Sequence, residues 1–239
     1  MAFTNVQKTG ATGDTTSISK AFASNVTANN IITVVGHRFT TSSDDFVAGD
    51  CTQSAGTATL GTITLDKTFS HNTSGSNFLV VGVWSAVVSG TGSCTMQVGN
   101  GGAGSSHNIG IAEASSSGST YSVEATNTGE GTSGNAATGN ATSAGAALFV
   151  GGVTISGSGA ITITEDSPFV LMWEEENGAL HLQSSAIYEI VTTGTTDAAG
   201  WTIGTNTGWS AAVVVYKEGS GAGSDFNNLQ NATPFFIFQ

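Results

Sequence analysis

The chain has 239 residues, a net charge of −12 and only 9% charged side chains, compared with roughly 25% in an average soluble domain. Binding to nucleic acids or to anionic membranes depends on clustered Lys and Arg side chains. The basic residues of this chain are few and scattered, which argues against both kinds of partner. They are Lys8, Lys20, Arg38, Lys67 and Lys217. No run approaches the ~18 apolar residues of a membrane span. We therefore expect a folded protein with an uncharged polar surface and with neither a nucleic-acid nor a membrane partner.

The first residues, MAFTNVQKTGATGDTT, contain no apolar core of signal-peptide length and no charged leader. If Met1 is native, we expect a chain made in the host cytoplasm without Sec export. Assembly there, followed by exposure outside as part of a virion, agrees with the uncharged polar composition. An extracellular or cell-surface location is the alternative.

Strand patterns extend along the whole chain, whereas helical periodicity is absent and the 33 glycines would each cost a helix interior ~1 kcal/mol. In chain order the predicted strands are Phe3–Gln7, Ser17–Phe22, Ile31–Phe39, Ala58–Leu65, Asn77–Val88, Ser93–Val98, Asn108–Ala114, Tyr121–Thr126, Ala147–Ile155, Ala160–Thr164, Phe169–Trp173, Ala186–Val191, Gly200–Ile203 and Ser210–Tyr216.

Several of these strands alternate between apolar and polar residues, which indicates one buried and one solvated face. In SCTMQVG the residues Cys94, Met96 and Val98 share one face, and in AITITED the apolar face holds Ile161 and Ile163. The runs NFLVVGVW, ALFVGGV and AAVVVY are continuous, as expected for strands in the middle of a covered sheet. Many short strands separated by Gly, Ser and Asn predict an all-β, two-sheet antiparallel sandwich of the jelly-roll type.

Three Gly- and Ser-rich stretches divide the chain. We interpret Asn100–His107 as a mobile hairpin loop and Thr128–Ala146 as a long surface excursion, because neither contains the large apolar residues that a core needs. The third stretch, Glu218–Asn228, follows the last good strand and has the composition of a flexible tether. We therefore expect a sandwich domain over residues 1–217 and an extension over residues 218–239.

The extension ends in the apolar sequence TPFFIFQ. Chain ends are normally polar, and four large apolar groups left in water would promote aggregation. We expect the segment to be buried against a neighbouring subunit, although docking on its own sheet is the alternative. The predicted subunit interface is Pro234, Phe235, Phe236, Ile237 and Phe238.

Residues that could carry chemistry are few. The histidines are isolated, with His71 and His107 expected to be exposed, and no hydrolase elbow, zinc-protease motif or phosphate loop is present. We therefore assign no catalytic, cofactor-binding or metal-binding residue. Cys51 and Cys94 are interpreted as separate thiols, with a disulfide between them left open.

Two acidic groups provide weaker alternatives. In WEEENG, Glu174 and Glu176 share one side of an extended strand, as the carboxyl pair of a retaining glycosidase would, although a solvated turn is the preferred interpretation. In SSDDFVAGD, Asp44, Asp45 and Asp50 could offer oxygen ligands to calcium, but without the spacing of a known calcium loop.

The four tryptophans raise the alternative of sugar binding. Trp84 and Trp209 stand in apolar strands and are expected in the core. Trp201, which follows DAAG, and Trp173 are the candidates for contact with a glycan.

Residues 2–217 resemble a family of Ser/Thr/Gly-rich β-sandwich domains of phage virion proteins and bacterial surface proteins. The resemblance depends on the order of FASNVTANNIITVVG, IGIAEASS, ALFVGGV and SAIYEIVTTGTTDAAGWTIGTNTGWSAAVVVYK. The aromatic residue that usually follows the central Glu is missing, and Ala114 stands in its place. The resemblance implies a jelly-roll or lectin-like sandwich with a structural or adhesive role.

The composition and the resemblance together favour a non-enzymatic structural virion protein, such as a phage capsid decoration or head-surface subunit. Its partners would be other copies of itself or a major capsid protein. The alternatives are a carbohydrate-binding adhesin module that contacts surface glycans and a self-assembling extracellular filament subunit.

Overall fold

The computed structural model describes residues 3–13, 15–99, 106–157, 159–175 and 182–219. The chain is almost entirely β, so the predicted all-β sandwich is confirmed. The first half contains β1 (Thr4–Gly13), β2 (Ile18–Ala21), β3 (Ile31–Thr40), the short 3-10 turn η1 (Ala48–Asp50), β4 (Cys51–Gly56), β5 (Thr59–Leu60), β6 (Thr64–Ser74), β7 (Asn77–Gly90), β8 (Cys94–Val98) and β9 (Ser106–Ser115).

The second half contains β10 (Tyr121–Gly131), β11 (Asn135–Ala137), β12 (Ala141–Ser143), β13 (Ala147–Ser156), β14 (Ile163–Glu165), β15 (Val170–Glu175), β16 (Leu182–Val191), β17 (Thr195–Asp197), β18 (Gly200–Ile203) and β19 (Trp209–Glu218). Every predicted strand overlaps an observed one. Most of β6 and all of β4, β11, β12 and β17 were missed, because their sequences are mainly polar or small.

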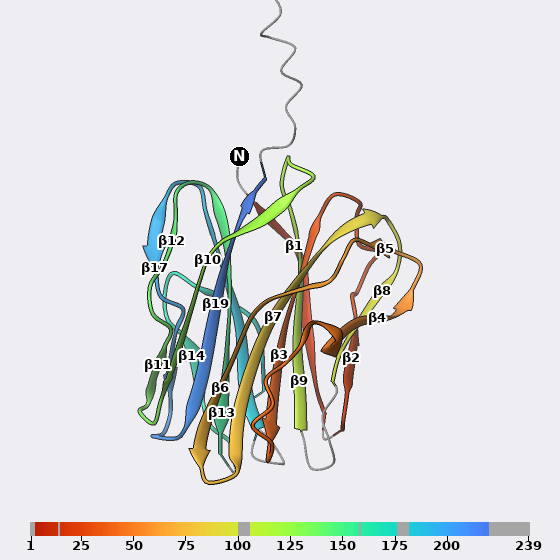
Figure 1. The fold of residues 1–239 in the computed structure, drawn as a ribbon. Helices are drawn as coiled ribbons and strands as arrows, with labels where there is room; N and C mark the ends of the chain where they lie inside the picture. The colour runs from red at the N-terminus through yellow and green to blue at the C-terminus, as the bar shows by residue number, and fades with distance from the viewer. Residues whose placement is uncertain (1–2, 14, 100–105, 158, 176–181, 220–239) are drawn as a thin grey trace, which may run out of the picture.

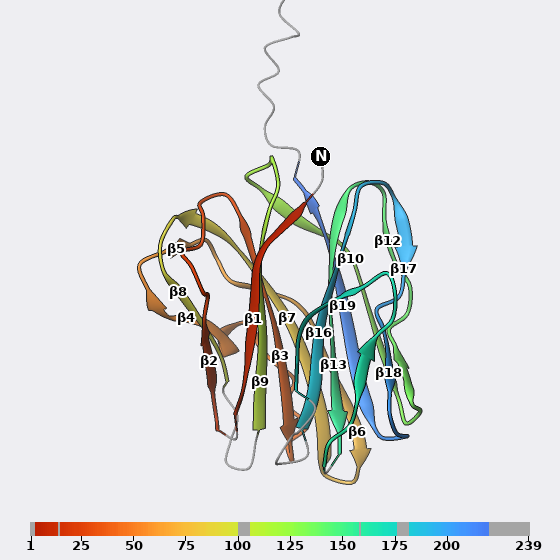
Figure 2. The ribbon, with the colours of Figure 1, turned by 180° about the vertical axis from the view of Figure 1, so that it is seen from behind.

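Two large antiparallel sheets form the centre of the molecule. The first central sheet has the order β1-β9-β3-β7, with β5 and β6 both paired to β7, and the second has the order β10-β19-β13-β16-β15. Smaller sheets cover their outer faces: β2-β8-β4 on the first, and β11-β18-β14 with β12-β17 on the second. The predicted two-sheet core therefore carries an additional layer on each side (Figures 1 and 2).

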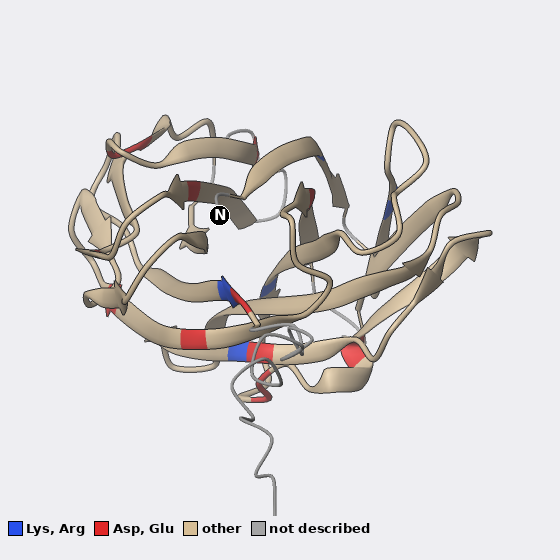
Figure 3. Cartoon of the chain, turned by 90° about the horizontal axis from the view of Figure 1, so that it is seen from above, with Lys and Arg blue, Asp and Glu red and all other residues tan. Residues whose placement is uncertain are grey.

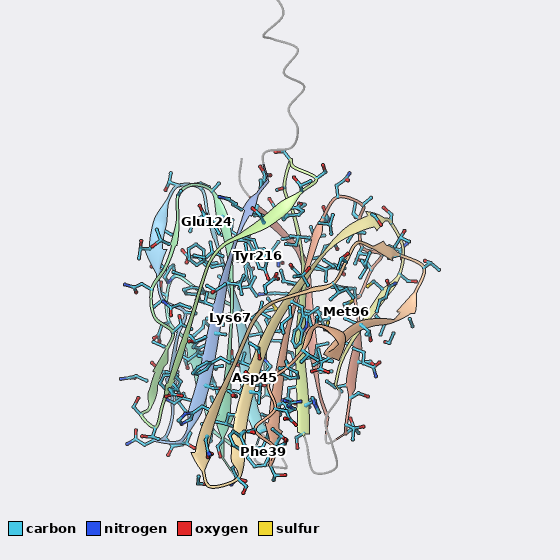
Figure 4. The ribbon with its side chains drawn as sticks, viewed as in Figure 1. Phe39, Asp45, Lys67, Met96, Glu124 and Tyr216 are labelled. Carbon is cyan, nitrogen blue, oxygen red and sulfur yellow. The ribbon has the colours of Figure 1, made fainter. Side chains whose placement is uncertain are left out.

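Three apolar cores separate these layers. Val35, Val81, Leu148 and Val214 belong to the core between the two central sheets. Each outer layer encloses a further core, around Trp84 and Met96 on one side and around Phe149 and Trp201 on the other; Figure 4 shows Met96 on the side of β8 and Tyr216 near the middle of the molecule. Because both faces of each central sheet are covered, β3, β13 and β19 are buried along almost their whole length, as their continuous apolar runs predict.

The two halves are structural repeats. The orders β1-β9-β3-β7-β6 and β10-β19-β13-β16-β15 correspond strand by strand, and so do β2-β8-β4 and β11-β18-β14. The two halves also share a bulge in the first strand, at Val6 and at Glu124, and another in an edge strand, at Asp66 and at Met172. We call residues 4–115 the first repeat and residues 121–218 the second repeat.

The bulges fix which residues are equivalent. Val6 bulges opposite the pair Ala114 and Glu113, and Glu124 opposite the pair Tyr216 and Val215, so Ala114 corresponds to Tyr216. Ala114 pairs with Ile31 of β3, and Tyr216 pairs with Leu148 of β13. Ile31 therefore corresponds to Leu148, and the bulges at Asp66 and Met172 lead to the same alignment of β3 with β13.

Equivalent residues meet where the repeats pack together. The rings of Phe3 and Tyr121 lie 5.7 Å apart. A Cβ placed on Gly152 would lie 2.4 Å from Cγ1 of Val35, its counterpart in β3. A two-fold axis brings equivalent residues into contact with each other. These contacts therefore indicate a pseudo-two-fold axis that runs along the strands, between the central sheets.

Both ends of the described chain lie at the upper end of the sandwich in Figure 1. The amide of Gly219 donates to the Thr120 carbonyl at 2.8 Å, next to the ring pair of Phe3 and Tyr121. The predicted extension beyond this point lies outside the described residues. Within the described ranges there is no helix long and apolar enough to cross a bilayer.

The interpretation of Thr128–Ala146 as a surface excursion was wrong. This stretch contains the end of β10 and the strands β11 and β12, and it places Ala136 and Ala141 in the outer core of the second repeat. Both alanines belong to the same core as the much larger Trp201. A search for large apolar residues therefore overlooks these strands.

Candidate functional site

The predicted subunit interface, Pro234, Phe235, Phe236, Ile237 and Phe238, lies outside the described residues. The body that precedes it presents little apolar surface. Among the described residues the exposed large hydrophobics are four valines, Val6, Val47, Val123 and Val170. Charged positions on the described ribbon are also sparse (Figure 3). The described part of the chain therefore exposes few large apolar side chains and carries few charges, as the composition predicts.

The prediction that Trp201 contacts a glycan was wrong. Its indole is fully buried in the outer core of the second repeat, and Nε1 donates to Ser185 Oγ at 3.2 Å. Trp201 lies on β18, whose inner face turns toward the second central sheet. The small residues before it, DAAG, had suggested a loop, but Ala199 is itself buried.

Trp173 is half-buried and lies across the edge strand β1. A Cβ on Gly10 would come within 2.1 Å of Trp173 Cγ, so glycine is what lets the indole lie against β1. The His37 ring lies 6.4 Å from it. Sugar contact by Trp173 stays a prediction. Of the glycosidase pair, Glu174 is half-buried on β15, and Glu176 lies outside the described residues.

Two histidine expectations were also wrong. His107 is fully buried at the start of β9, where its Nδ1 lies 2.9 Å from the Thr15 carbonyl and therefore donates to it. His71 is largely covered, with its Nδ1 2.8 Å from Glu130 Oε2. In both cases a segment from elsewhere in the chain, the bend at Thr15 for His107 and β10 for His71, covers a residue that its local sequence placed in a loop.

The two thiols are free and buried. This finding supports the interpretation of Cys51 and Cys94 as separate thiols. Burial, together with neighbouring negative charge, raises the pKa of Cys51 to about 12 and that of Cys94 to about 11.

The most developed polar site surrounds Arg38, the one arginine of the sequence. A hollow of about 380 Å³ opens between the end of β3 and η1, and we call it the Arg38 basin. Its lining consists of Arg38, Thr40, Ser42, Asp44, Asp45, Val47 and Asp50. Figure 4 places Asp45 in the lower half of the molecule, away from the end where β1 starts and β19 finishes.

The Arg38 guanidinium is held rigidly. Only 4% of the residue is exposed, its Cζ lies 4.7 Å from the centre of the Phe46 ring, and Nη2 donates to the Asp44 carbonyl. Burial lowers the pKa of Arg38, and the charges of Asp50, Asp44 and Asp45 counter that effect. Its Nε is buried and has no hydrogen-bond partner within the described chain.

The acidic side of the basin is formed by the loop that precedes β4. Asp50 is buried, and its Oδ2 accepts from the Val47 amide at 2.8 Å, which fixes η1. Asp44 and Asp45 are exposed, and the Ser42 hydroxyl donates to the Asp44 carboxylate. In the part of the chain that the structure describes, no three His, Cys, Asp or Glu side chains gather in a way that would hold a metal ion.

Comparison of the repeats shows that the fold does not need an arginine here. In the alignment fixed by the bulges, Arg38 corresponds to Ile155, which is fully buried in the outer core of the second repeat. The loop between β3 and β4 contains η1, whereas the loop between β13 and β14 is shorter. The basin is therefore specific to the first repeat. The sequence pattern identifies the acidic loop as a candidate site, but it does not identify the arginine on the strand before that loop.

Two other polar clusters lie between layers. Burial, and secondarily the charge of Asp197, raises the pKa of Glu189 to about 7, and Glu189 Oε2 has no partner among the described residues. Tyr216 donates to Asp66 Oδ2 at 2.7 Å, beside a small cavity of about 120 Å³ that Tyr216 lines together with Ser85. Neither cluster has the size or the set of groups that the Arg38 basin has.

Comparison of the chain with known protein families, with curated proteins and with solved structures finds no match in any of the three.

Proposed function

We propose that the protein is a non-enzymatic structural subunit of a virion, either a capsid decoration protein or a head-surface subunit, and that it attaches through its apolar C-terminal segment. The observation that supports this proposal is the contrast between body and tail. The described body exposes four valines as its large hydrophobics, whereas the last residues of the chain are PFFIFQ. A contact that buries apolar surface would therefore use the tail.

The position of the chain ends agrees with this role. The described chain finishes at Gly219, at the upper end of the sandwich. The 20 residues that follow would span at most about 70 Å when extended, which is enough to reach a neighbouring subunit. An added strand would offer backbone hydrogen bonds as well as the phenylalanine side chains.

The test is deletion of residues 233–239. We expect a folded sandwich with a nearly unchanged melting temperature that no longer assembles or binds expanded capsids. Phe236→Ser with Phe238→Ser should give the same loss, because both side chains share one face of an extended strand. Val47→Ser, which removes an exposed valine at the Arg38 basin, is the matched control and should leave assembly intact. A truncated protein that unfolds, or that assembles normally, would contradict the proposal.

The partner is either a capsid protein or another copy of this chain. Electron micrographs of the purified protein distinguish these cases, because a tail that binds the next copy in open succession produces filaments. A protein that stays monomeric when alone but binds capsids would favour the role of a capsid decoration protein.

A further inference from the structure

We infer that the Arg38 basin is a binding site for a neutral saccharide. The starting point is the buried arginine. In the second repeat the equivalent position holds the buried Ile155, so the fold accepts an apolar side chain there. Burying a guanidinium instead costs free energy unless its donors are paired. Among the described residues the Arg38 guanidinium makes one hydrogen bond, to the Asp44 carbonyl, and its buried Nε has none.

The charges around the basin limit the ligand. Asp44, Asp45 and Asp50 outnumber the single guanidinium, so an anion would be repelled although it could pair with Arg38. A simple cation would pair with the carboxylates but would leave the guanidinium unpaired. A ligand that fits must have no net charge and must carry hydrogen-bond acceptors and donors close to one another.

Sugar hydroxyls meet this requirement, because each one both donates and accepts. One hydroxyl oxygen would accept from the Arg38 guanidinium while the hydroxyl groups beside it donate to the carboxylates of Asp44 and Asp45. Ser42 and Thr40 add further hydroxyls to the lining, and the exposed Val47 supplies an apolar contact at the rim. The hollow of about 380 Å³ is within the range of small-ligand sites, which is roughly 300–1,000 Å³.

The site is also built before any ligand arrives. The guanidinium is fixed by the Phe46 ring and by the Asp44 carbonyl, and η1 is fixed by Asp50. Preorganised groups lose little freedom on binding, which favours affinity. The basin lies away from the end where the described chain finishes, so this inference stands apart from attachment through the tail, and loss of residues 233–239 should leave it unchanged.

The experiment is an NMR titration of the full chain, labelled with ¹⁵N, with glucose, galactose, mannose, rhamnose and N-acetylglucosamine. Sialic acid is the anionic probe and calcium chloride the metal probe. We expect at least one neutral sugar to shift the amide signals of residues 42–50, with a dissociation constant near 1 mM, equivalent to about −4 kcal/mol, and sialic acid to shift none of them.

Asp45→Ala is the main variant, because Asp45 is exposed and its loss should not affect folding. It should weaken sugar binding about tenfold, equivalent to ~1.4 kcal/mol. Arg38→Lys should abolish binding if the variant folds, and Asp197→Asn, on the second repeat, is the charge-matched control with unchanged affinity. The inference is overturned if no neutral sugar shifts residues 42–50, if calcium alone shifts them, or if Asp45→Ala binds as tightly as the parent chain.

Discussion

His37 and Thr154 hold equivalent positions in the two repeats and contact each other between the central sheets, with His37 Nδ1 3.1 Å from Thr154 Oγ1. The Thr154 hydroxyl donates to the Val80 carbonyl at 3.1 Å. It can therefore only accept from the imidazole, so the proton of neutral His37 is on Nδ1. Nε2 is buried and has no partner among the described residues.

This geometry predicts a loss of stability in acid. Burial lowers the pKa of His37 to about 3, against about 6.5 in an unfolded chain. The unfolded state therefore binds the proton first, and the free energy of unfolding should fall as the pH drops below 6.5, by about 3 kcal/mol at pH 4 from this residue alone. Urea denaturation between pH 7 and pH 4 measures it. His37→Gln should remove this part of the pH dependence, and an unchanged dependence in that variant would contradict the assignment.

The raised pKa of Glu189 predicts a loss of stability as the pH rises. Its folded pKa of about 7 is above the value of about 4.3 in an unfolded chain. The stabilising contribution of Glu189 is fully present below the pKa of the unfolded chain, and it is lost as the pH rises through the folded pKa of about 7. Glu189→Gln should therefore stabilise the protein by up to about 3 kcal/mol at pH 8 and have little effect at pH 4.

The measurement for Glu189 is the free energy of unfolding at both pH values, together with a carboxyl ¹³C titration of the parent chain. Asp197→Asn is the control, since removal of the nearby charge should lower the pKa of Glu189. A Glu189 that titrates near 4 would contradict the prediction.

Gly152 should tolerate no side chain. A Cβ there would lie 2.4 Å from Val35 Cγ1 and 3.0 Å from His37 Cε1, both in the packed interface between the repeats. Gly152→Ala should therefore lower the free energy of unfolding by about 1–3 kcal/mol. Gly145→Ala is the matched control, because nothing lies within 4 Å of the added Cβ. Equal melting temperatures for the two variants would show that the interface relaxes more easily than expected.

The two repeats should stay together after the chain between them is cut. The link between β9 and β10 is short and lies at one end of the sandwich, whereas the central core is made by residues of both repeats. A protease site inserted after Ser119 should give two fragments that elute as one species in gel filtration and separate only in denaturant. Fragments that separate at once would mean that the central core is weaker than its burial indicates.

The thiols should be unreactive in the folded protein. Both are buried, and their raised pKa values leave almost no thiolate at pH 8. Ellman's reagent should react with neither Cys51 nor Cys94 until denaturant is added, and then with both. Rapid reaction of one thiol without denaturant would show that the outer sheet β2-β8-β4 opens readily.

The sequence alone determined the class of the fold and the faces of many strands. The alternation in SCTMQVG placed Cys94, Met96 and Val98 on the buried face, as observed. The continuous apolar runs placed β13 and β19 in the middle of a sheet that packs on another layer, and both are buried along almost their whole length. These predictions are accurate because period-two alternation is a local property, set by the pleat of each strand.

Only the tertiary structure decided which strands pair, and therefore which residues meet. It revealed the two repeats, whose counterpart residues are often chemically different, as in Val35 and Gly152 or Arg38 and Ile155. It also buried Trp201 and His107, whose local sequences had suggested exposure. The physical reason is that strand pairing and layer packing join residues far apart in the chain, so the covering of a polar or glycine-rich segment depends on a distant partner rather than on its own composition.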